Sequence, residues 1–244
     1  MSSAVYTRFE LLRTFRNRRF FLLAFGFPLV LYFLIAAPNR HVESLAGTGI
    51  SAPLYYMTGL AAFGTMSAML STGARIASER SVGWNRQLRI TPLSTRTYFR
   101  AKVVTAYIVA VASLVLLYLS GAILGVRLSA HEWVQMTVLI LVGLIPFAIM
   151  GIFFGHIVSA DSIGPLMGGS TALFAFLGGT WFPITNGVLR RIAELLPSYW
   201  LVQASHVALG GGAWGARGWI VIAAWTVGLA ILAARAWRRD TGRA

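Results

Sequence analysis

Six long stretches of the sequence contain no Asp, Glu, Lys or Arg, and they constrain the fold more than any other feature. The hydrocarbon core of a bilayer is roughly 30 Å thick, so about 20 apolar helical residues cross it. The stretches are residues 20–37, 52–74, 103–126, 133–156, 163–182 and 218–234. Only 11% of the chain is charged, whereas a soluble domain carries roughly a quarter charged residues. The sequence therefore predicts an all-α integral membrane protein, with six transmembrane helices in a single domain, 1–244.

The distribution of basic residues predicts the orientation of these helices. Sixteen of the 21 Lys and Arg residues lie before the first stretch, in the 75–102 loop or at the C-terminus, and the other loops share five. Because Lys and Arg accumulate on the cytoplasmic side, we expect both termini and the 75–102 loop to be cytoplasmic. The expected location is the plasma (inner) membrane of a bacterium. A net charge of +14 fits anionic lipid headgroups better than nucleic acid.

Two further segments are expected to contact the membrane without crossing it. Residues 4–19 place Val5, Phe9 and Leu12 on one helical face, which predicts an amphipathic helix at the cytoplasmic interface. An arginine cluster that only sets topology is the alternative. Residues 183–216 include an uncharged stretch that prolines and glycines interrupt, so we expect an outer segment that is re-entrant or lies on the surface.

Several kinds of chemistry are not expected on this chain. It has no cysteine and no G-x-x-x-x-G-K-[ST] phosphate loop, and its acidic residues are scattered. They are Glu10, Glu43, Glu79, Glu132, Asp161, Glu194 and Asp240. We therefore expect no enzyme, no metal site and no ATPase site. No acid or base lies in the middle of a predicted span, which argues against an ion-coupled carrier.

The polar segment SERSVGWNRQLRITPLS, residues 78–94, interrupts two apolar stretches. Ser78 and Glu79 suit the start of a short helix, and Thr91-Pro92 suits its end. Ser94 is placed to cap the next span. Because Trp and Arg are common interface hot spots, the tryptophan and arginines of this segment predict a docking site for a cytoplasmic partner. A solvated basic loop without a partner is the alternative.

Two motifs carry a resemblance to a known family. Glu79-Arg80-x-x-Gly83, Leu88 and Thr91-Pro92-Leu93-Ser94 are similar to the E-R-E-x-G-T…L…T-P-L-S signature of type-2 ABC exporter permeases of the daunorubicin-resistance, drug- and lipid-exporting type. Gly178-Gly179-x-Trp181-Phe182-Pro183, followed by Leu196-Pro197-x-Tyr199-Trp200, resembles the family's second motif. The resemblance covers essentially the whole chain. Ser81, Trp84-Asn85 and Arg86 depart from it and make the loop more basic, which suggests an acidic groove on the partner.

The resemblance implies a type-2 ABC permease fold with residues 4–19 as a connecting helix and the 75–102 loop as a cytoplasmic coupling loop. It implies two copies of a cytoplasmic ABC ATPase, which bind ATP and Mg, with no cofactor on this chain. It also implies a second permease copy, as a homodimer or with a paralogue. The residues expected to dock the ATPase are Glu79, Arg80, Gly83, Trp84, Arg86, Leu88, Thr91 and Pro92.

The resemblance also implies that the second and fifth spans face each other across the dimer axis, so a cargo path is expected between them. Its candidate residues are Phe63, Met66, Phe174, Trp181 and Phe182. Ordinary packing and an interfacial aromatic belt are the alternative explanation for these side chains. Because the path carries no charge, we expect export of a lipophilic or amphipathic drug, natural product or lipid, as in multidrug efflux and antibiotic resistance. Two alternative functions remain: an ion-coupled secondary carrier, and a non-transporting membrane scaffold for an ATPase.

Overall fold

The computed structural model describes residues 3–17, 22–83, 94–185, 187–209 and 213–242, and all regular structure in these ranges is helical. This agrees with the predicted all-α class. The elements are α1 Ser3–Phe15, η1 Leu22–Gly26, α3 Phe27–Ala36, η2 Leu45–Gly47, α4 Ala52–Ser81, α6 Thr95–Ile123, α7 Ala130–Gly143, α8 Ile145–Ile157, α9 Ala160–Leu177, α10 Gly187–Ala193, α11 Pro197–Gln203, η3 Ala204–Leu209 and α12 Ala216–Gly242.

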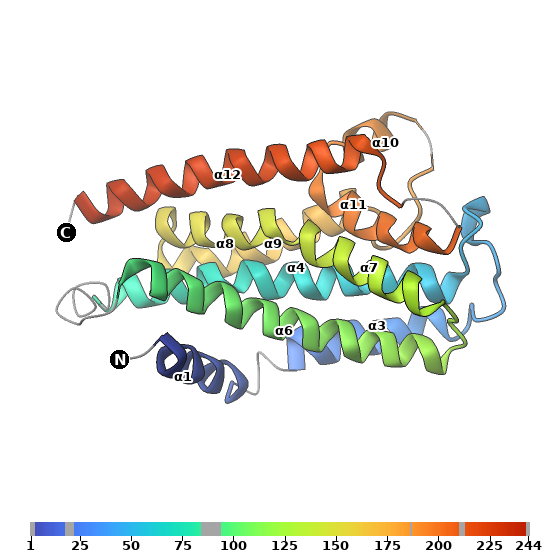
Figure 1. Cartoon of the computed structure of the whole chain (residues 1–244), viewed down its shortest axis with the longest axis horizontal. Coiled ribbons are helices and arrows are strands. Elements are labelled where there is room, and N and C mark those ends of the chain that lie inside the picture. The colour runs from blue at the N-terminus through green and yellow to red at the C-terminus, as the bar shows by residue number, and fades with distance from the viewer. Residues whose placement is uncertain (1–2, 18–21, 84–93, 186, 210–212, 243–244) are drawn as a thin grey trace.

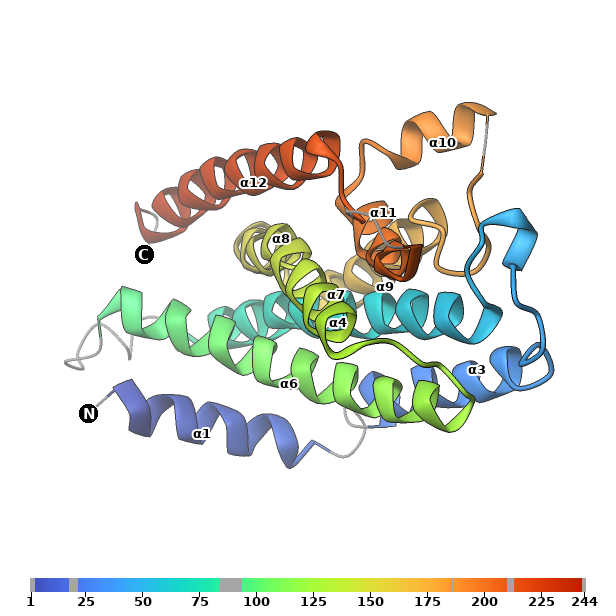
Figure 2. The same cartoon turned by 45° about the vertical axis from the view of Figure 1, so that its right-hand side comes forward.

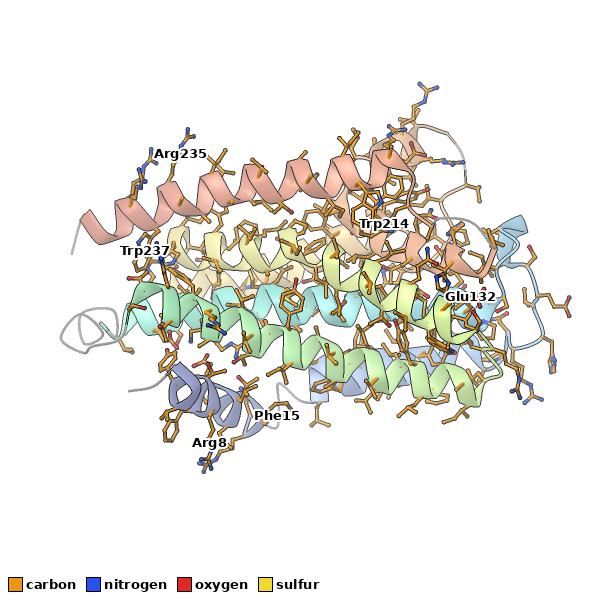
Figure 3. All side chains as sticks on the ribbon, viewed as in Figure 1. Arg8, Phe15, Glu132, Trp214, Arg235 and Trp237 are labelled. Atoms are coloured by element: carbon orange, nitrogen blue, oxygen red, sulfur yellow. The ribbon has the colours of Figure 1, made fainter. Side chains whose placement is uncertain are left out.

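The long helices run side by side along one axis of an elongated bundle (Figure 1). The start of α1, the C-terminal ends of α4 and α12 and the start of α6 lie at one end, which we name the termini end. The loops around η2 and α10 lie at the opposite end, the far end. Figure 3 shows Arg8 and Arg235 toward the termini end and Glu132 toward the far end. The segments richest in arginine are therefore gathered at one end of the molecule.

Helix α4 is the centre of the bundle and contacts α3, α6, α8, α9 and α11 (Figure 2). Its closest neighbour is α8, because glycines on both helices leave room for backbone contact. A β-carbon on Gly151 would lie 2.7 Å from the carbonyl oxygen of Met69, and one on Gly73 would collide with the carbonyl oxygen of Gly151. Small residues allow such close helix approach.

In the part of the chain that the structure describes, three helical segments are long and apolar enough to cross a membrane, namely Thr95–Ile123, Ala130–Ile157 and Ala216–Arg239. The second comprises α7 and α8, which meet at Leu144 where Pro146 occupies the first turn of α8. A shorter apolar helix spans Ala24–Ala36. Large apolar side chains such as Leu119 and Ile123 are exposed on these helices, as expected of surfaces that face lipid. The count of six spans stays a prediction.

Helix α1 confirms that the N-terminal segment is helical, but its polar face is the one that packs against the bundle. Val5, Phe9 and Leu12 are exposed, while Glu10 and Thr14 are buried. A helix on a soluble protein would bury the opposite face. The exposed apolar face suits contact with the acyl chains at a bilayer surface.

The 183–216 segment contains one exposed and one buried helix. Val188 and Arg191 of α10 are exposed, whereas residues 197–202 of α11 are all buried. Helix α11 lies among α4, α7, α9 and α12. Pro197 at its first turn suits a helix start, because the missing N–H would have no helical partner there.

Candidate functional site

The predicted docking segment begins inside a long helix, so the expectation that Ser78 caps a new helix is wrong. Helix α4 continues to Ser81, and Ser78 lies in its last turn. Gly83 has a φ of 71°, a left-handed conformation that glycine adopts readily and that commonly ends a helix. Ser94 caps α6 as predicted, because its side chain accepts a hydrogen bond from the Thr97 N–H at 3.2 Å.

Five of the predicted docking residues lie in residues 84–93, outside the described part of the chain. They are Trp84, Arg86, Leu88, Thr91 and Pro92. Their contact with an ATPase stays a prediction, as does that of Glu79, Arg80 and Gly83. The two helix ends that border residues 84–93 are described in full, and they meet at the termini end of the bundle.

These helix ends enclose a buried pair of carboxylates that share one ammonium group. The Lys102 side chain is 0% exposed, and its Nζ donates to Glu10 Oε1 at 2.7 Å and to Glu79 Oε1 at 2.5 Å. The side chains of Glu10 and Glu79 are 5% and 4% exposed. The Lys102 Nζ also lies 5.2 Å from the centroid of the Tyr98 ring. A residue each from α1, α4 and α6 is thus joined in one place.

Further groups complete the hydrogen bonding of the two carboxylates. Arg13 Nη1 donates to Glu79 Oε1 at 3.0 Å, and the Tyr98 hydroxyl donates to Glu79 Oε2 at 2.6 Å. Arg75 Nη1 lies 3.7 Å from Glu10 Oε1 and donates to the Thr14 hydroxyl. We name this set the ionic cluster; its members are Glu10, Arg13, Arg75, Glu79, Tyr98 and Lys102. Buried charges are tolerated only when they are paired and hydrogen-bonded in this way.

The ionic cluster was not predicted from the sequence because its members are distant along the chain. Glu10 and Lys102 are 92 residues apart. One signal was present: Lys102 is the only lysine in a chain whose other basic residues are all Arg. An ammonium is a compact charge with three donors, so it fits between two carboxylates where a planar guanidinium would need more space.

Arg80 joins the same helix end to a different neighbour. Its Nη1 donates to the carbonyl oxygen of Gly155 at 2.9 Å and to that of Val158 at 3.4 Å, both at the C-terminal end of α8. Carbonyl groups at a helix C-terminus lack helical partners and attract cations. Glu79 and Arg80, adjacent in the sequence signature, therefore fasten α4 to α1 and α6 on one side and to α8 on the other.

Two of the predicted cargo-path residues lie in contact. The ring centroids of Phe63 and Trp181 are 5.6 Å apart, and those of Phe63 and Phe27 are 5.8 Å apart. Met66 is completely buried within the chain. The path through these side chains stays a prediction.

The other two predicted path residues point to different neighbours. The Phe174 ring packs against Phe147 at 5.2 Å and Trp225 at 5.9 Å, between α8 and α12. The Phe182 ring packs against Phe176 at 5.2 Å. The arrangement of the five candidates along one path stays a prediction.

Comparison with known proteins identifies the class of this protein. The family described as ABC-2 family transporter protein matches residues 44–235. The chain belongs to this family, and it is a type-2 ABC permease, the membrane subunit of an ABC transporter. It is similar to the "Putative transport permease YvfS" of Bacillus subtilis (strain 168), with 29% identity over 210 residues that cover 84% of this chain and 81% of the relative. Membership of the family implies an ATPase on a partner subunit.

Proposed function

We propose that this permease exports a lipophilic or amphipathic compound from the cytoplasm or the inner leaflet. Two copies of an ABC ATPase bind ATP and Mg and act on the permease through residues 78–94. The observation that carries this proposal is the ionic cluster. It ties α4 and α6, the helices on both sides of residues 84–93, to each other and to α1, so a displacement of this segment moves all three together.

Arg80 extends the same connection to α8. A rigid assembly of four helix ends converts a small movement at the docking segment into a tilt of helices along the bundle. In this mechanism Glu79 does not face the ATPase, because its carboxylate oxygens bind Lys102, Arg13 and Tyr98. Glu79 and Arg80 hold the base of the docking segment, and residues between 84 and 93 make the contacts with the partner.

We propose six membrane crossings with both termini in the cytoplasm. The arginine count supports this orientation, as does the position of the start of α1, the start of α6 and the C-terminal ends of α4 and α12 at one end of the bundle. Helix α1 then lies in the cytoplasmic interface with Val5, Phe9 and Leu12 toward the acyl chains. Residues 183–216 form the outer segment, in which α11 is re-entrant.

We propose that two copies of this chain form the transporter. Helix α9 presents an exposed face on which a β-carbon at Gly164 or Gly168 would meet nothing within 4 Å. Small residues on an exposed helix face allow a second helix to approach closely in a membrane. A paralogue with a similar face is the competing partner.

The carrier alternative has to account for two buried acidic residues. Glu10 and Glu79 are buried, and both lie outside the predicted spans. Both are paired with Lys102, so neither carboxylate is left without a cation. The family and these pairings together favour an ATP-driven permease.

The test is reconstitution of this chain in sealed vesicles with its partner ATPase. We expect ATP-dependent movement of a lipophilic dye, absent when ATP is omitted or when the ATPase is left out. ATP hydrolysis without dye movement would favour the scaffold. Dye movement that an ion gradient drives without the ATPase would favour the carrier.

A further inference from the structure

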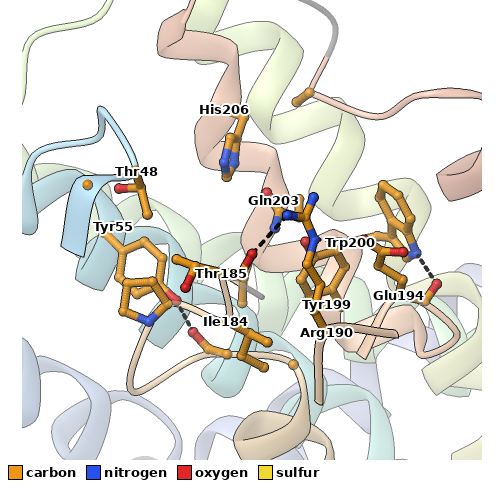
Figure 4. A pocket seen from close by; sticks show the side chains of 16 residues that line it. Thr48, Tyr55, Ile184, Thr185, Arg190, Glu194, Tyr199, Trp200, Gln203 and His206 are labelled. Carbon is orange, nitrogen blue, oxygen red and sulfur yellow. Dashed lines mark hydrogen bonds and ion pairs between the residues drawn. The ribbon is translucent and has the colours of Figure 1, made fainter. Parts of the chain in front are cut away.

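A cavity of about 450 Å³ opens at the far end of the bundle (Figure 4). Its size lies within the roughly 300–1,000 Å³ typical of small-molecule sites. Its walls come from the η2 turn, the start of α4, the residues that follow α9, and the α10, α11 and η3 elements. Its lining residues include Tyr55, Thr185, Arg190, Glu194, Trp200, Gln203 and His206.

Two arginines neutralise the one carboxylate of this cavity, and of these Arg190 lines the cavity whereas Arg217 does not. Glu194 is the one acidic residue among its described lining residues, and both of its carboxylate oxygens are occupied. Arg190 Nε donates to Oε1 at 2.9 Å, and Arg217 Nη1 donates to Oε2. Two guanidinium groups thus face one carboxylate, and no carboxylate oxygen is free to bind a cationic ligand.

The Arg190 guanidinium is fixed at the cavity wall. Arg190 Nη1 donates to the Thr185 carbonyl oxygen at 2.9 Å, which holds the guanidinium beside the hollow. Figure 4 shows Gln203 and His206 directed toward the same hollow. Burial lowers the pKa of His206, so its ring is neutral at pH 7 and carries one N–H donor. The His206 Nδ1 has no hydrogen-bond partner among the described residues.

The remaining wall is largely aromatic and apolar. The rings of Tyr55 and Trp200 line it, together with Ile184 and Val202. Hydrogen bonds fix both rings, because the Tyr55 hydroxyl donates to the Gly179 carbonyl oxygen and the Trp200 indole N–H donates to the Glu194 carbonyl oxygen at 3.1 Å. A fixed cation and N–H donors therefore stand beside a rigid apolar surface.

We propose that this cavity binds an amphipathic molecule through an anionic head, a carboxylate or a phosphate, with Arg190 opposite the head and the Tyr55 and Trp200 rings against the first methylene groups. Charge-assisted bonds from arginine to carboxylate or phosphate are among the strongest in proteins. The inference rests on the proposed function only in placing the cavity at the outer face. Binding is measured without ATP or the ATPase, so a failure of transport and a failure of binding are separate results.

The chain has no cysteine, so one introduced thiol reports on the cavity. Thr185→Cys places that thiol at the exposed rim and leaves the backbone carbonyl that holds Arg190. The variant, in phosphatidylcholine nanodiscs, is labelled with a maleimide in the presence of octyl phosphate, octyl glucoside, octyltrimethylammonium or inorganic phosphate. We expect octyl phosphate to slow labelling at concentrations where the other three have no effect.

Substitutions on α10 then test the role of Arg190. In the Thr185→Cys background, Arg190→Gln should raise the octyl phosphate concentration needed for protection by about tenfold or more, which is the worth of one charge-assisted hydrogen bond. Arg191→Gln removes the same charge from the next position, which does not line the cavity, and should leave protection unchanged. Arg190→Lys keeps the charge and should retain part of the protection.

Several results would overturn the inference. Equal protection by octyl glucoside or octyltrimethylammonium would exclude selection for an anionic head. Equal protection by inorganic phosphate would show a site for a free anion instead of an amphiphile. Equal losses in Arg190→Gln and Arg191→Gln would assign the effect to general surface charge. The head-group comparison needs only the Thr185→Cys variant, so it stands even where an α10 substitution disturbs folding.

Discussion

The ammonium of Lys102 lies 2.5 Å from Glu79 Oε1, and this ion pair closes the gap between the helix that leads into residues 84–93 and the helix that leads out. Such a pair has two consequences. It keeps the distance between the end of α4 and the start of α6 constant. It also makes the position of α1 depend on both helices, because the same Lys102 binds Glu10.

Removal of Lys102 should be the most damaging single substitution at the termini end. Lys102→Met keeps the side-chain length but leaves two buried carboxylates without their shared cation. We expect a loss of about 3–5 kcal/mol in stability, as for other broken buried pairs. Thermal unfolding in detergent measures this loss. Arg100→Met, an exposed position on the same helix, should unfold like the wild type; a Lys102→Met variant as stable as the wild type would contradict the pairing.

Arg80→Ala should separate ATP hydrolysis from transport. The substitution removes the bonds to the Gly155 and Val158 carbonyl oxygens, so the end of α4 loses its attachment to α8. We expect the reconstituted complex to hydrolyse ATP but to move several times less dye per ATP. Ser81→Ala, one residue further on an exposed side, is the matched control. Unchanged coupling in Arg80→Ala would show that α8 needs no attachment there.

Glycine substitutions should have opposite effects on α8 and α9. Gly151→Ala places a methyl group against the backbone of α4 and should destabilise the fold by about 1–3 kcal/mol through overpacking. Gly168→Ala meets nothing within 4 Å and should stabilise α9 by about 0.5–1 kcal/mol through its better helix propensity. Thermal unfolding of detergent-solubilised monomers measures both changes in stability. If Gly151→Ala also stabilised the protein, the close α4–α8 contact would be contradicted.

The neutral His206 should make the far end sensitive to acid. Its folded-state pKa is lowered from 6.5 by burial, with a further contribution from the positive charge of Arg190. The folded state therefore binds fewer protons, so stability is lost as the pH falls below about 6.5. His206→Gln should flatten the dependence of the unfolding temperature between pH 7 and pH 5. His131→Gln, at an exposed position on α7, should leave that dependence as it is in the wild type.

Local features of the fold could be predicted from the sequence, because they depend on neighbouring residues. The stretch 52–74 lies within α4, and Ser94 caps α6 as its type and position indicated. The extension of α4 through Ser81 was missed because Ser78-Glu79 has the composition of a helix start. A buried salt bridge on Glu79 makes this polar turn compatible with the interior, and nothing within the segment itself reports it.

The close contact between α4 and α8 was not predicted from the sequence. Gly151 and Gly155 of α8 make this contact with α4. Small residues in a sequence show where a helix permits close approach. They do not show which helix packs there or with which of its faces. The far-end cavity was missed for a similar reason, since its walls come from parts of the chain as distant as Gly47 and Ala213.

The ionic cluster also fixes an order of events during biosynthesis. Glu10 leaves the ribosome 92 residues before Lys102. Helix α1 is therefore synthesised early but has no cation from α6 to bind until the third apolar stretch is being inserted. Until then its carboxylate stays in water at the membrane surface, where hydration stabilises it. The N-terminal helix is thus among the first segments made, but it reaches its final position only after α4 and α6 have been inserted, and its docking reports that this insertion has succeeded.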